Sequence, residues 1–252
     1  MRLPTPLGAL VATLALAGCG GGGGGGYTPD LKVSAAASLK SPLTAYANAF
    51  TAAHVRLSFG GSDVLAAQIR QGARADVYAA ANAALPDALY AQRLVERPVP
   101  FASNRLVLAV PAGSSARGLR DLERRGRRLA VGSATVPIGA YTGQVLARLD
   151  PSERALLLAN VRSREPDVTG IVGKLTQGAV DGGFVYATDV RATKGALRAI
   201  ELPAALQPRV VYEAAVVRGS DHAPQARAFI DGLLHGRGAT ELRAAGFGPA
   251  PS

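Results

Sequence analysis

The chain has 252 residues, of which 48% are hydrophobic and 18% are charged, so it contains enough apolar material to build a sizeable core. Its formal net charge is +10, but the basic residues are scattered, tryptophan is absent and aromatic residues make up only 5%. Nucleic-acid binding is therefore not expected, because few side chains are available to stack on bases. A single cysteine excludes an internal disulfide and any site that needs more than one thiolate.

The N-terminal segment predicts export. Arg2 supplies a short positive region, and the apolar stretch Leu7–Leu16 is too short to span a bilayer. The motif Leu16-Ala17-Gly18-Cys19 follows and resembles the lipobox of bacterial lipoproteins, in which the signal is cut before the cysteine and the thiol carries two acyl chains. We expect a signal peptide over residues 1–18, lipidation of Cys19, and a glycine-rich tether over residues 19–28.

From Leu31 onward, short apolar runs alternate with segments of helical periodicity. The continuous run Leu106–Val110, which ends at Pro111, indicates a strand buried on both faces. Helices are expected to begin near Ser38 and Ser62. The remaining expected strands are Leu31–Ser34, Val55–Phe59, Val77–Ala79, Leu129–Gly132, Gly183–Tyr186 and Val210–Val217, and the closing helices are Ala223–Leu234 and Ala239–Ala245. This alternation predicts an α/β fold with largely parallel sheets.

Sequence signatures of catalysis are missing. None of the three histidines has a metal-ligand spacing. The motif Ser220-Asp221-His222 contains the residue types of a catalytic triad, but adjacent residues cannot adopt triad geometry. The motif Gly61-Ser62-Asp63 lacks the second glycine of a nucleophile elbow, and no Walker motif is present. We therefore expect a protein that is not an enzyme and that has no cofactor and no free metal cation.

The junctions between strands and helices are more informative. In a parallel α/β sheet, ligands bind where strands end and helices begin, because helix N-termini offer free N–H donors and a partial positive charge. Such junctions here contain Ser38, Ser62, Ile138-Gly139 and Val168-Thr169-Gly170, with small hydroxyl or glycine residues and no acidic side chain at the key position. These donors are suited to an anion with several oxygens.

The same stretches resemble the periplasmic molybdate-binding protein of ABC importers, from Leu31 to Phe247. The matching motifs, in order, are Ala35–Leu39, Ser58–Ser62, Gly72–Tyr78, Asn104–Leu108, Val136–Tyr141, Asp167-Val168 and Phe184–Asp189. The resemblance implies a two-lobed periplasmic binding protein fold of type II, in which each lobe is a mainly parallel sheet flanked by helices and a hinge joins the lobes. Two long β segments, near Leu106 and near Val211, are the expected crossings between lobes. The first lobe would contain residues 29–107 and 216–252, and the second residues 108–215.

The resemblance also implies the ligand contacts. Ser38 and Ser62 would each donate a hydroxyl and a backbone N–H, Ile138 and Val168 a backbone N–H, and Tyr186 its phenolic O–H. From the residues alone, the two serines are better explained as ordinary helix N-caps, and the other three as core residues. The implied protein is a monomeric, lipid-anchored, extracytoplasmic solute-binding component that delivers molybdate or tungstate to an ABC transporter permease.

Other ligands and roles stay open at this point. Sulfate would satisfy the same donors, so its rejection would depend on cavity size. A protonated phosphate would leave its own O–H without an acceptor, at a cost of about 1–3 kcal/mol. A small organic acid, or a lipid-anchored sensor or adhesion module without transport, remains an alternative, because fold does not fix function. Asp63 departs from the resembled pattern. Pointing away, it is a helix first-turn acid; pointing inward, it would repel a dianion or accept a proton from a phosphate-like ligand.

Overall fold

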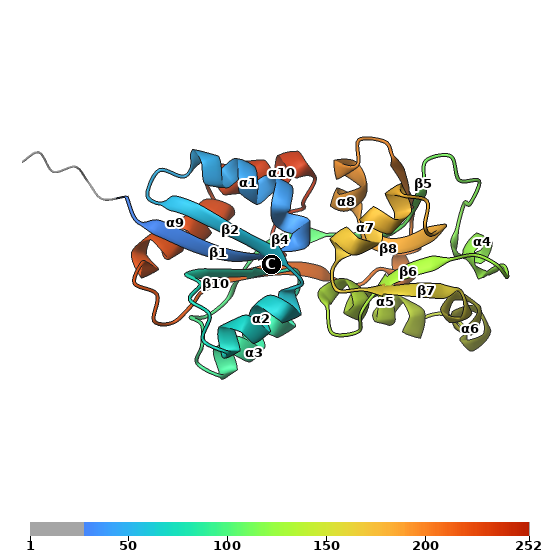
Figure 1. Ribbon diagram of the computed structural model, residues 1–252, viewed down its shortest axis with the longest axis horizontal. Helices are drawn as coiled ribbons and strands as arrows, with labels where there is room; N and C mark the ends of the chain where they lie inside the picture. The colour runs from blue at the N-terminus through green and yellow to red at the C-terminus, as the bar shows by residue number, and fades with distance from the viewer. Residues whose placement is uncertain (1–27, 252) are drawn as a thin grey trace, which may run out of the picture.

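The computed structural model describes residues 28–251, which form two lobes that lie side by side along the long axis of the molecule (Figure 1). The expected signal peptide, Cys19 and most of the expected tether lie outside the described residues. Between residues 28 and 251, no helix combines the length and the apolar character needed to cross a membrane.

The first lobe is built on a five-stranded sheet with the order β2-β1-β3-β10-β4. β1 pairs in parallel with β2 and β3, whereas β10 runs antiparallel to both β3 and β4. The strands are β1 (Asp30–Ala36), β2 (His54–Gly60), β3 (Val77–Ala80), β4 (Val99–Asn104) and β10 (Val210–Val216). The helices are η1 (Ala37–Leu39), α1 (Lys40–Ala49), α2 (Ser62–Arg70), α3 (Ala84–Ala91), α9 (Ala223–Leu234) and α10 (Arg237–Ala245).

The second lobe repeats this plan in a sheet with the order β7-β6-β8-β5-β9. β6 pairs in parallel with β7 and β8, whereas β5 runs antiparallel to β8 and β9. The strands are β5 (Leu106–Pro111), β6 (Leu129–Gly132), β7 (Val161–Glu165), β8 (Gly182–Tyr186) and β9 (Leu197–Glu201). The helices are α4 (Leu119–Glu123), α5 (Pro137–Ala147), α6 (Pro151–Ala159), α7 (Val168–Thr176), α8 (Ala187–Ala192) and η2 (Ala204–Leu206).

The chain crosses between the lobes twice, from β4 to β5 and from β9 to β10, so two segments of the chain build the first sheet. The expected boundaries need correction. β5 joins the second sheet from Leu106, and Val210–Val216 pairs with β3 and β4 in the first sheet, whereas the sequence analysis assigned residues 108–215 to the second lobe. An apolar run reveals a strand but not its partner, so the return crossing could not be located from the pattern.

The sheets are mixed rather than mainly parallel. Each sheet contains one strand that follows a crossing between the lobes and runs antiparallel to both of its neighbours. This strand is β10 in the first lobe and β5 in the second. The parallel strands β1, β2 and β3, and likewise β6, β7 and β8, occupy the other side of each sheet. The carboxyl ends of the two parallel sets carry the strand-to-helix junctions that form the site described below.

Candidate functional site

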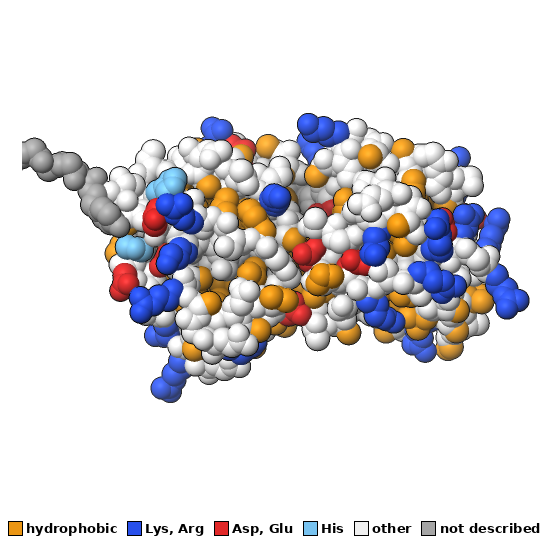
Figure 2. Space-filling model, in the orientation of Figure 1, with side chains coloured by type: hydrophobic (Ala, Val, Ile, Leu, Met, Phe, Trp, Pro, Cys, Tyr) orange, Lys and Arg blue, Asp and Glu red, His pale blue; other side chains and the backbone are white. Residues whose placement is uncertain are grey.

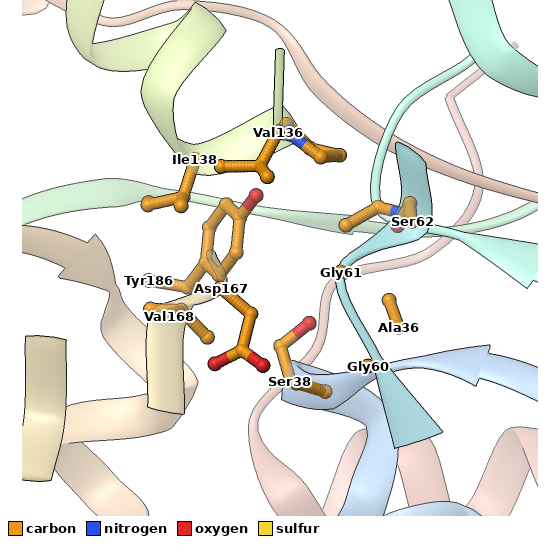
Figure 3. Close-up of a pocket in the computed structure, with 13 residues that line it drawn as sticks. Ala36, Ser38, Gly60, Gly61, Ser62, Val136, Ile138, Asp167, Val168 and Tyr186 are labelled. Carbon is orange, nitrogen blue, oxygen red and sulfur yellow. The ribbon is translucent and has the colours of Figure 1, made fainter. Parts of the chain in front are cut away.

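A small cavity lies between the lobes and is lined by residues from both (Figure 3). Its volume is about 20 Å³. One water needs roughly 10–15 Å³ by this kind of measure, whereas sites for drug-sized molecules have roughly 300–1,000 Å³. The lining residues are Ala36, Ala37, Ser38, Gly60, Gly61, Ser62, Ala81, Val136, Pro137, Ile138, Asp167, Val168 and Tyr186. The space therefore suits a compact ion and excludes a bulky organic solute.

All five residues that the sequence analysis selected line this one cavity: Ser38, Ser62, Ile138, Val168 and Tyr186. Figure 3 shows the two serines on the side of the first lobe, facing the other three on the side of the second lobe. These residues are separated by up to 148 positions in the chain (186 − 38), and the two sheets bring them together.

Helix starts supply backbone donors on both sides of the cavity. Ser62 is the first residue of α2 and Val168 the first residue of α7. α5 begins at Pro137, which has no N–H, so Ile138 carries the first amide donor of that helix. First-turn N–H groups have no acceptor within their own helix, and each helix start carries a partial positive charge. An anion in the cavity would meet several such ends at once.

The two serines are not helix caps. The N-cap positions of η1 and α2 are occupied by Ala36 and Gly61, and neither makes a side-chain capping bond. The Oγ of Ser62 accepts the Ala81 N–H at 3.2 Å, which leaves the hydroxyl hydrogen available to a ligand. The Oγ of Ser38 lies 3.0 Å from the Oη of Tyr212, a neighbour that the sequence pattern did not reveal. The capping interpretation of both serines is therefore wrong.

The hydroxyl of Tyr186 is buried and has no hydrogen-bond partner among the described residues. The residue is 1% exposed, and its ring packs edge-on against Tyr141 and Tyr212 with centroid distances of 6.4 and 5.8 Å. Burial, reinforced by the neighbouring tyrosines and Asp189, raises the pKa of Tyr186 well above its ordinary value. The group is therefore a protonated donor, and leaving it unpaired costs about 1–3 kcal/mol. An acceptor in the cavity would remove that cost.

Within the described part of the chain, no lysine or arginine lines the cavity, and Asp167 is the one carboxylate in its wall. Its Oδ1 accepts the Gly170 N–H at 3.2 Å and so caps α7. The expectation that these junctions lack an acidic side chain is thus wrong at α7, although an aspartate before Val168 is itself a recognisable N-cap signal in the sequence.

In the view of Figure 2, basic side chains gather most densely at the far end of the second lobe, away from the cavity.

Asp189 lies directly behind the site, in the first turn of α8. Its Oδ2 accepts the Tyr186 N–H at 3.0 Å. Burial raises the pKa of Asp189 to about 7, the Tyr186 N–H opposes this shift, and the charge of Asp167 adds to it. At a pH between the ordinary pKa of 3.8 and the raised pKa of about 7, Asp189 is therefore protonated in the folded chain and ionised in the unfolded chain.

This shift predicts how stability depends on pH. The free energy of unfolding should fall as pH rises from about 4 to about 7 and should level off above, because the folded state binds the extra proton only within that window. Asp189→Asn should flatten this fall, since its amide oxygen can still accept the Tyr186 N–H. Urea unfolding across the window measures the slope. Asp150→Asn, which removes an exposed carboxylate, should keep the wild-type slope, and an unchanged slope in Asp189→Asn would contradict the assignment.

Comparisons with known proteins agree with this architecture. The family model described as "Bacterial extracellular solute-binding protein" matches residues 31–248. The molybdate-binding protein ModA of Mycobacterium tuberculosis is 32% identical over 225 residues, which are 86% of this chain and 84% of that protein. The putative ABC transporter substrate-binding lipoprotein YvgL of Bacillus subtilis is 27% identical over 248 residues, or 90% of each chain.

Among solved structures, the periplasmic molybdate-binding protein of Azotobacter vinelandii superposes with a TM-score of 0.77 at 23% identity, covering 88% of this chain and 100% of that one. This likeness supports the two-lobed periplasmic binding protein fold. The family match extends over most of the chain and includes every residue that lines the cavity. The chain therefore belongs to the bacterial extracellular solute-binding proteins, and it is an extracytoplasmic binding protein rather than an enzyme.

Proposed function

We propose that this protein binds molybdate in the interlobe cavity and serves as the solute-binding component of an ABC importer. The oxyanion would be held by neutral donors from both lobes: the hydroxyl and backbone N–H of Ser38 and Ser62, the backbone N–H of Ile138 and Val168, and the phenolic O–H of Tyr186. The similarity to the mycobacterial molybdate-binding protein supports the choice of ligand. The name of the Bacillus relative supports the transporter role.

One observation carries the proposal: among the described residues the buried Tyr186 hydroxyl has no hydrogen-bond partner, and it belongs to a cavity that helix starts surround. A tetrahedral dianion offers lone pairs in every direction, so it can accept from all of these donors simultaneously. Hydrogen bonds to a charged ligand are stronger than neutral ones, and burial of donors such as Ser62 and Tyr186, each 1% exposed, strengthens them further. Basic side chains are not required, because the helix ends provide the compensating potential.

The donor set also bears on competing ions. A hydrogenphosphate ion needs one acceptor for its proton, whereas every group proposed to hold the ion is a donor. Over residues 28–251, Asp167 is the one carboxylate in the cavity wall, and the Gly170 N–H engages its Oδ1. Phosphate should therefore bind more weakly than a fully deprotonated ion. Sulfate is fully deprotonated but smaller, so it would leave some of the donors beyond hydrogen-bonding distance. Tungstate shares the charge and shape of molybdate and should bind in the same way.

Isothermal titration of the purified protein with each anion tests the proposal. Molybdate and tungstate should bind tightly, sulfate more weakly and phosphate most weakly. Binding of phosphate or sulfate in preference to molybdate would reassign the ligand. Absence of any oxyanion binding would favour the alternative of a sensor module that reuses the fold.

We further propose that Cys19 carries a lipid anchor after removal of residues 1–18, and that the glycine-rich segment over residues 19–28 tethers the domain near the permease. The motif Leu16-Ala17-Gly18-Cys19 supports this, as does the lipoprotein name of the Bacillus relative. Two acyl chains on one residue give stable membrane association. Membrane fractionation tests the anchor, because Cys19→Ala should move the protein from the membrane fraction to the soluble one.

A further inference from the structure

Asp63 of the first lobe makes a contact with the second lobe outside the cavity. It lies in the first turn of α2, half-buried, and its Oδ1 accepts the Val64 N–H at 2.8 Å. Its Oδ2 accepts the hydroxyl of Thr135 at 2.7 Å, across 72 residues of sequence. Thr135 lies just before α5, the helix that brings Ile138 to the cavity. The side chain thus points across the cleft, a direction that differs from both orientations considered from the sequence.

The lobes also meet closely next to this hydrogen bond. A Cβ atom placed on Gly61 would lie only 2.5 Å from the carbonyl oxygen of Pro166 in the second lobe. The same atom would lie 3.6 Å from a methyl group of Val136. The edge formed by Gly61 and Asp63 therefore touches two separate segments of the second lobe, and it does so at the border of the cavity.

We propose that the Asp63–Thr135 hydrogen bond is a latch that holds the cleft closed and determines how long the ligand stays bound. The bond joins the two lobes, so it exists only while they are together, and its whole free energy favours the closed state. Both carboxylate oxygens are engaged by donors, and Asp63 is absent from the cavity wall. The Asp63 carboxylate therefore contacts the second lobe and does not line the space where the anion would bind.

The latch should act on dissociation. The cleft must break this contact in order to open, so the contact slows the release of a bound ligand. Because Thr135 is exposed and water competes for its hydroxyl, the effect should be moderate, a roughly three- to fivefold change in the dissociation rate. The ligand-release part of this inference rests on the proposed binding of molybdate, whereas the closure part does not.

Thr135→Val tests the latch, since valine keeps the shape of the side chain and removes the donor. In the full-length protein, it should speed the release of radiolabelled molybdate three- to fivefold. Small-angle X-ray scattering of the unliganded protein should show a larger radius of gyration than in wild type. Asp63→Ala should have a similar effect, and the double variant should be no worse than the stronger single one, because both changes remove the same bond.

Thr176→Val is the matched control. Thr176 is an exposed residue of α7 in the same lobe, and its hydroxyl bonds only to carbonyl oxygens of its own helix, at 3.0 Å from Val172 and from Gly173. This variant should release molybdate at the wild-type rate. Unchanged release and unchanged scattering in Thr135→Val, or effects of the two single variants that add in the double variant, would overturn the latch. A wild-type protein that binds no molybdate would refute the proposed ligand, and the scattering comparison would still decide the latch.

Discussion

Replacing Tyr186 with phenylalanine is expected to weaken molybdate binding about 10- to 100-fold without destabilising the unliganded protein. The change removes one hydroxyl whose only expected partner is the ligand. A hydrogen bond to a charged group contributes about 1.5–3 kcal/mol, which gives the loss of affinity. The same hydroxyl is buried and has no partner within residues 28–251, so its removal should raise the free energy of unfolding of the protein without ligand by about 1 kcal/mol.

Two measurements separate these effects: isothermal titration with molybdate, and urea unfolding without ligand. Tyr78→Phe is the matched control, because the buried Tyr78 hydroxyl donates to the Ser62 carbonyl oxygen at 2.7 Å. That variant should lower the free energy of unfolding by about 1 kcal/mol, the reverse of the effect at Tyr186. Wild-type affinity in Tyr186→Phe would remove the central argument for the site. A large loss of stability in that variant would show that the hydroxyl has a partner within the protein.

The strands and helices of this protein are mostly readable from the sequence, whereas their pairing is not. The run Leu106–Val110 predicted a strand buried on both faces, and every residue of that run is buried in β5. The apolar pattern is the same for parallel and antiparallel neighbours, so it could not show that β10 runs against β3 in the first sheet. Strand direction depends on where the chain crosses between lobes, and that is a tertiary property.

For the candidate site, the sequence likewise indicated which residues take part but not which neighbours they contact. The resemblance to a known family selected five residues, and the structure places all five on one cavity wall. The contacts that surround them were not predicted: Tyr212 beside Ser38, Asp167 in the wall, and Thr135 bonded to Asp63. Each depends on a side-chain direction that packing between distant segments decides. The matching motifs thus identify which residues line the cavity, and only the three-dimensional structure shows which neighbours these residues contact or hydrogen-bond.

Gly61→Ala is expected to reduce molybdate affinity roughly 10- to 100-fold by preventing the lobes from closing. The backbone angles of Gly61, φ −60° and ψ 131°, suit alanine, so the backbone of the first lobe need not change. Within that lobe the new methyl group would lie 2.9 Å from Asp63 Oδ1, at the end of a side chain that can shift. Across the cleft it would lie 2.5 Å from the Pro166 carbonyl oxygen, which belongs to the backbone. Such overpacking destabilises a structure by about 1–3 kcal/mol, and here it affects only the closed state, in which the two lobes meet.

The variant should therefore fold with wild-type stability when unliganded, and it should keep an enlarged radius of gyration in scattering even at molybdate concentrations that saturate the wild type. Gly143→Ala is the control, because the exposed Gly143 of α5 has no atom within 4 Å of an added Cβ. That variant should bind molybdate normally. If Gly61→Ala bound as tightly as the control, the close approach of the lobes at Pro166 would not be a feature of the liganded state, and the donors of the two lobes would have to reach the anion from a wider cleft.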